Sequence, residues 1–122
     1  MTSSRKPLAW VGSSKSDFLR LPQQIQRMMG YALNIAQQGA KDDDAKPLHG
    51  FGGCSVLEIV KSDGVGTYRA VYTVRFEDAM YVLHVFQKKS KSGIKTPKLD
   101  MDLIQSRLKD AQYIHDNRMK GL

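Results

Sequence analysis

Cysteine is almost absent from this chain of 122 residues, and long apolar runs are absent altogether. Cys54 is the only cysteine, which excludes an internal disulfide and a thiolate metal cluster. We expect Cys54 to be a small buried residue at a strand edge. No apolar stretch approaches the length of a membrane span, and no signal-peptide pattern opens the chain. We therefore expect a cytoplasmic protein.

The motifs of common metal and nucleotide sites are also missing. His49, His84 and His115 are scattered without the spacing of a zinc site, so we expect no metal. There is neither a GxxxxGKS/T phosphate loop nor a GxGxxG turn, and we expect no cofactor. His84 lies inside a predicted strand, in phase with Val82 and Phe86, which favours a buried core histidine.

Basic residues, by contrast, are abundant and unevenly placed. The formal net charge is +7, and residues 88–98 hold five lysines and no acid. The acids gather elsewhere, at residues 42–44 and in the C-terminal part of the chain. This distribution favours a polyanionic partner such as nucleic acid, the ribosome, an anionic membrane or an acidic protein.

The N-terminal half predicts a short strand followed by two helices. Residues 7–11 form the strand, and a serine at 14 or 16 begins a helix that runs to about Leu21. Pro22 begins a second helix, which Gly39 ends. Its apolar residues recur at helical spacing and predict a buried stripe. They are Ile25, Met28, Met29, Ala32, Leu33 and Ala36.

The C-terminal half predicts three strands and a helix. A polar, glycine-rich loop over residues 39–53 precedes strands at 55–60, 67–76 and 80–88, whose short links indicate an antiparallel meander. The last helix begins at Thr96-Pro97, with Thr96 as its cap. Its seam consists of Met101, Ile104, Leu108 and Ala111.

These elements predict one α+β domain over residues 1–122, with residues 1–6 disordered. Their order is strand, two helices, three strands, helix. We expect a small antiparallel sheet with the N-terminal helices packed on one face and a C-terminal helix in addition. The other face, or part of it, is expected to stay open for a ligand.

Alternation along the strand at 67–76 separates its two faces. One face is wholly apolar or aromatic and should point into the core. The other carries Arg69 and Arg75 together with Thr67, Val71 and Thr73. The arginines therefore point to solvent or ligand, or else pair across strands with Glu58 or Glu77.

Cations and hydroxyls support one kind of chemistry without a metal. RNA carries its own nucleophile, the 2′-OH, so an enzyme needs only to orient it against the adjacent phosphate and to stabilise the charge that develops. Arginine and lysine supply the charge, and a proton donor serves the leaving 5′-oxygen.

Several segments, taken in order, resemble the RelE/ParE toxin superfamily and most closely its phage-derived HigB-like branch. They are Lys46-Pro47-Leu48, Leu57-Glu58-Ile59, the run from Tyr68 to Tyr72, the run from Tyr81 to Ser90, and Thr96-Pro97 before the last helix. The resemblance covers Pro7 to about Ile114. It implies a toxin of a type II toxin–antitoxin system that cuts mRNA on the ribosome.

The resemblance also implies roles for individual residues. Arg69 occupies the place of the strand arginine that contacts the scissile phosphate, and Lys88 or Lys89 that of a basic residue near the leaving group. Glu58 is the nearest candidate base, or alternatively a structural partner of an arginine, because the lysines that RelE carries on this strand are absent here. The remaining cations would contact nucleic acid: Arg75, Lys91, Lys95 and Lys98.

Two other functions stay open. A ParE-like toxin inhibits gyrase by binding it and needs no nuclease residues, and a non-catalytic module would bind only RNA or antitoxin. In each case the resemblance implies a cognate helix-turn-helix antitoxin and a toxin–antitoxin hetero-oligomer. The nuclease hypothesis adds the ribosome and mRNA as partners.

Overall fold

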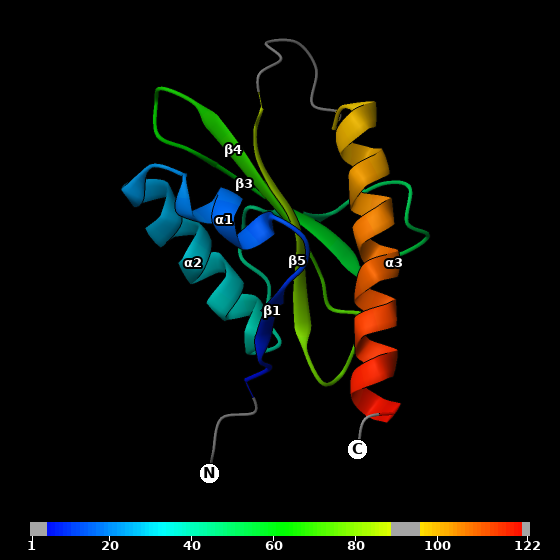
Figure 1. The fold of residues 1–122 in the computed structure, drawn as a ribbon. Helices are drawn as coiled ribbons and strands as arrows, with labels where there is room; N and C mark the ends of the chain where they lie inside the picture. Colours follow the sequence, from blue (N-terminus) through cyan, green and yellow to red (C-terminus); the bar gives the residue numbers. More distant parts are fainter. Residues whose placement is uncertain (1–4, 89–95, 121–122) are drawn as a thin grey trace.

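The computed structural model describes residues 5–88 and 96–120, which form an α+β domain. Figure 1 shows a sheet between two helical layers, with α1 and α2 on one face and α3 on the other. None of the helices in the described part of the chain combines the length and hydrophobicity of a membrane span. The elements are β1 (Leu8–Trp10), α1 (Ser14–Leu19), α2 (Gln23–Gln37), β2 (Ala45–Pro47), β3 (Val56–Ser62), β4 (Thr67–Thr73), β5 (Met80–Lys88) and α3 (Lys98–Lys120).

The sheet has the strand order β1-β5-β4-β3-β2. The predicted meander of β3, β4 and β5 is confirmed, and each neighbouring pair is antiparallel. The edge strand β1 instead runs parallel to β5. After β1 the chain passes through α1 and α2 to β2 at the opposite edge, and it reaches β5 only after β3 and β4. The sheet is therefore mixed, whereas the sequence predicted an antiparallel one.

The opposite edge strand, β2, was predicted to be part of a loop. It is only three residues long, Ala45–Pro47, and pairs antiparallel with β3. Lysine and proline are typical of edge strands, since they discourage pairing with another chain. So short a strand leaves too few residues for an alternating pattern, which explains why the sequence did not reveal it.

The first core lies between the sheet and α2, and it confirms the stripe predicted for that helix. Ile25, Met29 and Ala32 are fully buried, and they pack on Ala70 and Tyr72 of β4. Pro22 precedes α2, and Gly39, at φ 90°, follows its end. The apolar face of β4 was therefore assigned correctly to the core.

A second core lies on the face that was expected to stay open. Val71 and Thr73 of β4 are fully buried there, because the predicted seam of α3 covers them. Ile104 and Ala111 supply the buried centre of that seam. The prediction of an open face is wrong over this part of the sheet: the apolar residues of β3 and β5 provide enough surface for a helix to bury.

The β2–β3 edge is held by an ion-pair cluster. The Nζ of Lys61 lies 3.0 Å from Oδ1 of Asp42 and 2.8 Å from Oδ2 of Asp44. Burial disfavours the charged form of Asp42, but the backbone N–H of Asp44 and the Lys61 ammonium outweigh it and lower the pKa of Asp42. Burial likewise opposes the charge on Lys61, and the two carboxylates outweigh it and raise the pKa of Lys61.

Two smaller expectations have different outcomes. Cys54 was predicted to be buried, but it is exposed, because it lies in the loop before β3 begins at Val56. Of the N-terminal segment expected to be disordered, residues 1–4 lie outside the described residues. Lys6 donates from its backbone N–H to the carbonyl of Gln37 at 2.9 Å, which holds this part of the segment against α2.

Candidate functional site

Strand register brings three polar side chains together on the α3 side of the sheet. Glu58 of β3 and His84 of β5 both lie opposite Val71 of β4, so they stand on either side of that valine. Arg69 is the next residue of β4 on the same face, opposite Phe86. Neighbouring strands are about 4.8 Å apart. The backbone positions of Glu58 and His84 are therefore about 10 Å from each other, on the two strands next to the one that carries Arg69.

Arg69 and Glu58 form a buried ion pair. The Nη1 of Arg69 lies 2.8 Å from Oε1 of Glu58, and the two side chains are 6% and 11% exposed. The hydroxyl of Thr96 donates to the other carboxylate oxygen, Oε2, at 2.9 Å. The alternative pairing of Arg69 with Glu58 is thus confirmed. Thr96, which was predicted to cap the last helix, directs its hydroxyl to the sheet instead.

A bulge in β5 turns His84 toward this cluster. Val71 pairs with His84 but its neighbour Tyr72 pairs with Val82, so Leu83 is the extra residue. Beyond the bulge, His84 shares the α3 face with Phe86, on which its ring stacks with centroids 4.6 Å apart. The prediction of a buried histidine is confirmed, but the phase with Val82 is not, because a bulge shifts the alternation by one residue.

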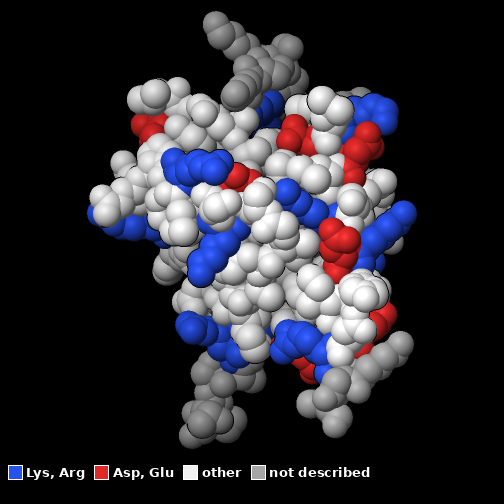
Figure 2. Space-filling model, in the orientation of Figure 1, with Lys and Arg blue, Asp and Glu red and all other residues white. Residues whose placement is uncertain are grey.

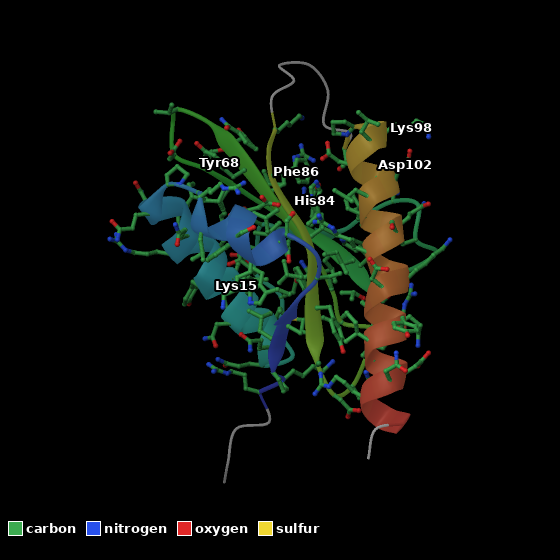
Figure 3. The ribbon with its side chains drawn as sticks, in the orientation of Figure 1. Lys15, Tyr68, His84, Phe86, Lys98 and Asp102 are labelled. Carbon is green, nitrogen blue, oxygen red and sulfur yellow. The ribbon has the colours of Figure 1, made fainter. Side chains whose placement is uncertain are left out.

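Both ring nitrogens of His84 have partners on α3. Nε2 lies 2.7 Å from Oδ1 of Asp100, and Nδ1 lies 3.4 Å from Nη1 of Arg107. Arginine only donates hydrogen bonds, so Nδ1 accepts and the ring proton belongs on Nε2, which donates to Asp100. Figure 3 shows His84 and Phe86 between β5 and the end of α3 that carries Lys98 and Asp102.

Arg107 extends this network to the N-terminal layer. Its Nη1 donates to the carbonyl of Leu83 at 3.0 Å, and its Nη2 donates to the hydroxyl of Ser13 at 2.9 Å. Gly12 makes room for the guanidinium: a Cβ at Gly12 would lie 2.7 Å from Nε of Arg107, and its φ of 59° is a glycine conformation. One arginine therefore connects α3, β5 and the turn before α1.

The predicted lysines divide into those the structure describes and those it does not. Lys88 ends β5 opposite Thr67, and alternation places it on the same face as Phe86. Lys98 begins α3 with a side chain 86% exposed, paired with Asp102 at 3.1 Å. Lys89, Lys91 and Lys95 lie outside the described residues, so their predicted roles remain expectations.

Arg75 does not join Arg69. β4 ends at Thr73 rather than at residue 76, so Arg75 lies beyond the strand, exposed, at the other end of the α3-covered face. Its guanidinium lies 3.4 Å from the hydroxyl of Ser55. Together with Phe51 and Lys109 it lines a shallow groove of about 430 Å³.

The surface charge of the described residues is mixed on the face that Figure 2 shows. On the face in Figure 2, lysine and arginine side chains are scattered over several elements and alternate with acidic ones. The lysine-rich stretch at residues 88–98 falls mostly on positions outside those described. The described basic residues therefore form no single stripe on this face.

Sequence reasoning missed Asp100 and Arg107 as site residues. A usable signal was present, because both residues lie at helical spacing from Ile104, next to the predicted seam of α3. Charged residues beside a buried stripe are candidates for partners inside the fold.

Comparison with known proteins identifies the family. Residues 16–109 match the phage-derived Gp49-like protein family (DUF891). The chain belongs to this family. No curated protein matches it.

Solved structures confirm the type of fold. A double-arginine mutant of the Escherichia coli toxin RelE in the free state superposes with a TM-score of 0.57 at 13% identity, covering 87% of this chain and 97% of that one. The isolated E. coli RelE toxin gives 0.54 at 17%, with 83% and 97% covered. The toxin–antitoxin complex RelBE2 of Mycobacterium tuberculosis gives 0.50 at 17%, with 73% and 98% covered.

The family match and the shared fold bear out the resemblance to the RelE/ParE superfamily. This Gp49-like protein has the RelE-like arrangement of N-terminal helices, sheet and C-terminal helix. At these identities the similarity shows the fold alone. The roles of Arg69, Glu58 and Lys88 therefore have to be inferred from the contacts and chemistry of these residues in this chain.

Proposed function

We propose that this Gp49-like protein is the toxin of a type II toxin–antitoxin system and cleaves mRNA on the ribosome. The observation that carries the proposal is the position of Arg69, an arginine on the central strand with a carboxylate beside it, within a fold shared with the toxin RelE. An antitoxin partner is supported by the RelBE2 complex, in which a toxin of this fold is bound to its antitoxin.

In the proposed reaction the RNA supplies the nucleophile. The carboxylate of Glu58 takes the proton of the 2′-OH, whose oxygen attacks the adjacent phosphorus while Arg69 stabilises the added charge. The bond from phosphorus to the 5′-oxygen breaks, and that oxygen takes a proton from Lys88 or Lys89. The products are a 2′,3′-cyclic phosphate and a 5′-hydroxyl.

The burial of Arg69 sets a condition on this reaction. The guanidinium of Arg69 is paired with Glu58, and the hydroxyl of Thr96 donates to the Glu58 carboxylate. A phosphate can therefore contact Arg69 only after these groups move. The same burial favours a second candidate, a protein that binds its target without cutting RNA, as in the ParE-like or non-catalytic alternatives.

Mapping RNA ends in translating cells separates these candidates. Tightly controlled expression should arrest growth and produce new mRNA ends in phase with codons, carrying 5′-hydroxyls. Arg69→Ala should abolish these ends, whereas Arg27→Ala, an exposed arginine on α2, should leave them unchanged. Co-expression of an antitoxin encoded beside the gene should restore growth.

Two outcomes would contradict the nuclease. Growth arrest with intact mRNA and accumulated DNA breaks would select gyrase inhibition. Harmless overexpression would select the non-catalytic module. If cleavage occurs but survives in Arg69→Ala, the nuclease stands and the assignment of its centre is wrong.

A further inference from the structure

The first turn of α3, residues 98–101, has little apolar contact of its own. Leu99 is 84% exposed, and the side chain of Lys98 is 86% exposed. Met101 is the one residue of this turn that packs partly against the second core. A helix end with so little buried surface depends on polar contacts to keep its place.

Two polar contacts connect this end of α3 to different strands. Thr96, just before the helix, donates to Glu58 of β3, and Asp100 accepts from His84 of β5. Arg69 lies on β4, between these strands. The start of α3 therefore lies across Arg69 and Glu58, which we call the arginine centre. It is held by contacts on both sides of Arg69.

His84 is suited to hold the helix rather than to react. Its side chain is 8% exposed, and its two nitrogens contact Asp100 and Arg107, so neither nitrogen faces open space in this structure. Arg107 in turn binds Leu83 and Ser13, which restricts the imidazole from the far side. The contacts orient the ring so that its Nε2–H points at Asp100.

We propose that His84 is a positioning residue for the arginine centre. Through Asp100 it holds the first turn of α3 in the place from which Thr96 reaches Glu58, and Glu58 in turn holds Arg69. For its effect on catalysis this inference rests on the proposed function. The local structural effect does not depend on it.

Amide hydrogen exchange in the full-length protein tests the structural effect directly. Asp100→Ala removes the acceptor and should speed exchange about tenfold or more at residues 101–104, the first amides of α3 with acceptors within the helix. Losing a contact of about 1.4 kcal/mol changes a local opening constant by a factor of ten. His84→Asn should do the same. Residues 111–116 of the same helix should keep wild-type rates.

Two variants serve as matched controls. Asp102→Ala removes a carboxylate from the same end of α3, but its side chain is 58% exposed and its ion-pair partner among the described residues is the exposed Lys98, so exchange should stay within about twofold of wild type. His84→Gln places an amide N–H near the position of Nε2 and should recover most of the protection that His84→Asn loses. If His84→Asn does not fold, Asp100→Ala tests the same contact without altering the sheet.

The inference is overturned if Asp100→Ala leaves exchange unchanged, or if Asp102→Ala has an equal effect. Where wild type cleaves RNA, Asp100→Ala should lower kcat about tenfold or more with little change in KM, and His84→Gln should retain more activity than His84→Asn. Equal kcat in wild type and Asp100→Ala would reject the positioning role. If wild type cleaves no RNA, the proposed function fails, and exchange still decides whether His84 holds the helix.

Discussion

The two ends of the α3-covered sheet face are built from the same strands and the same helix, yet they differ in kind. At one end Ile104 and Ala111 pack on Val71, Tyr81 and Leu83 in an apolar core. At the other end Arg69, Glu58 and His84 lie under Thr96 and Asp100 and are held by hydrogen bonds and an ion pair. The apolar end therefore attaches the middle of the helix by burial, whereas hydrogen bonds hold its first turn at the polar end.

The comparison predicts different consequences of substitution at the two ends. Truncating an apolar side chain lowers the stability in proportion to the buried surface and volume that are lost. Removing one partner of a buried ion pair causes a large loss of stability in a single step, because the remaining charge is neither paired nor solvated. Substitutions at each end of the face test this difference.

Breaking the ion pair from one side should cost most. Arg69→Met should reduce the free energy of unfolding by about 3–5 kcal/mol, because it leaves the Glu58 carboxylate buried without its cation. The double variant Arg69→Met with Glu58→Leu should recover most of that loss while remaining inactive. Urea denaturation followed by circular dichroism measures both. A loss below about 1 kcal/mol in the single variant would show that solvent reaches the pair.

Truncation at the apolar end should cost slightly less. Ile104→Ala should reduce the free energy of unfolding by about 2–5 kcal/mol through lost contact and the cavity that remains. Leu103→Ala, at a position 37% exposed on the same helix, should cost less than about 1 kcal/mol. Equal losses in the two variants would mean that α3 is not packed on its predicted seam.

The opposite face of β4 offers a buried polar group without a formal charge. Burial, with a smaller contribution from Asp42, raises the pKa of Tyr72 to about 12 from its ordinary value of 10.0. The folded state therefore holds this proton more tightly than the unfolded state does. That contribution is fully present below pH 10 and should fall by about 2–3 kcal/mol as pH rises to 12.

Tyr72→Phe should remove this alkaline loss. The measurement is the free energy of unfolding of both proteins between pH 9 and pH 12. The difference between the two curves isolates Tyr72 from the lysines that titrate in the same range. Parallel curves would show that the Tyr72 hydroxyl is as accessible in the folded protein as in the unfolded chain.

Removing one hydroxyl from the polar end should have the smallest effect. Thr96→Val deletes the hydrogen bond to Oε2 of Glu58 and should cost about 1–2 kcal/mol, since the acceptor is a charged group. Thr67→Val, which alters the hydroxyl near Ser62 in the β3–β4 hairpin, should cost less because that contact is exposed. Urea denaturation of the two variants side by side measures the difference.

The sequence alone determined the elements with a clear period. The stripe of α2, the seam of α3 and the meander of β3, β4 and β5 all follow from side chains that must be buried on one side. It also placed Arg69 on the face opposite the first core and named Glu58 as its possible partner. These are local properties, because alternation along a strand assigns a face without knowledge of its neighbours.

The cover of that face and the contacts made there depend on how the layers pack in three dimensions. A bulge at Leu83 turned His84 toward α3, and nothing in the periodicity of β5 shows where an extra residue falls. Asp100, Arg107 and Ser13 come from distant segments, and their contacts depend on how a helix is laid across a sheet. The sequence could name the charges, but burial and pairing, which set what those charges do, arise only when the layers pack.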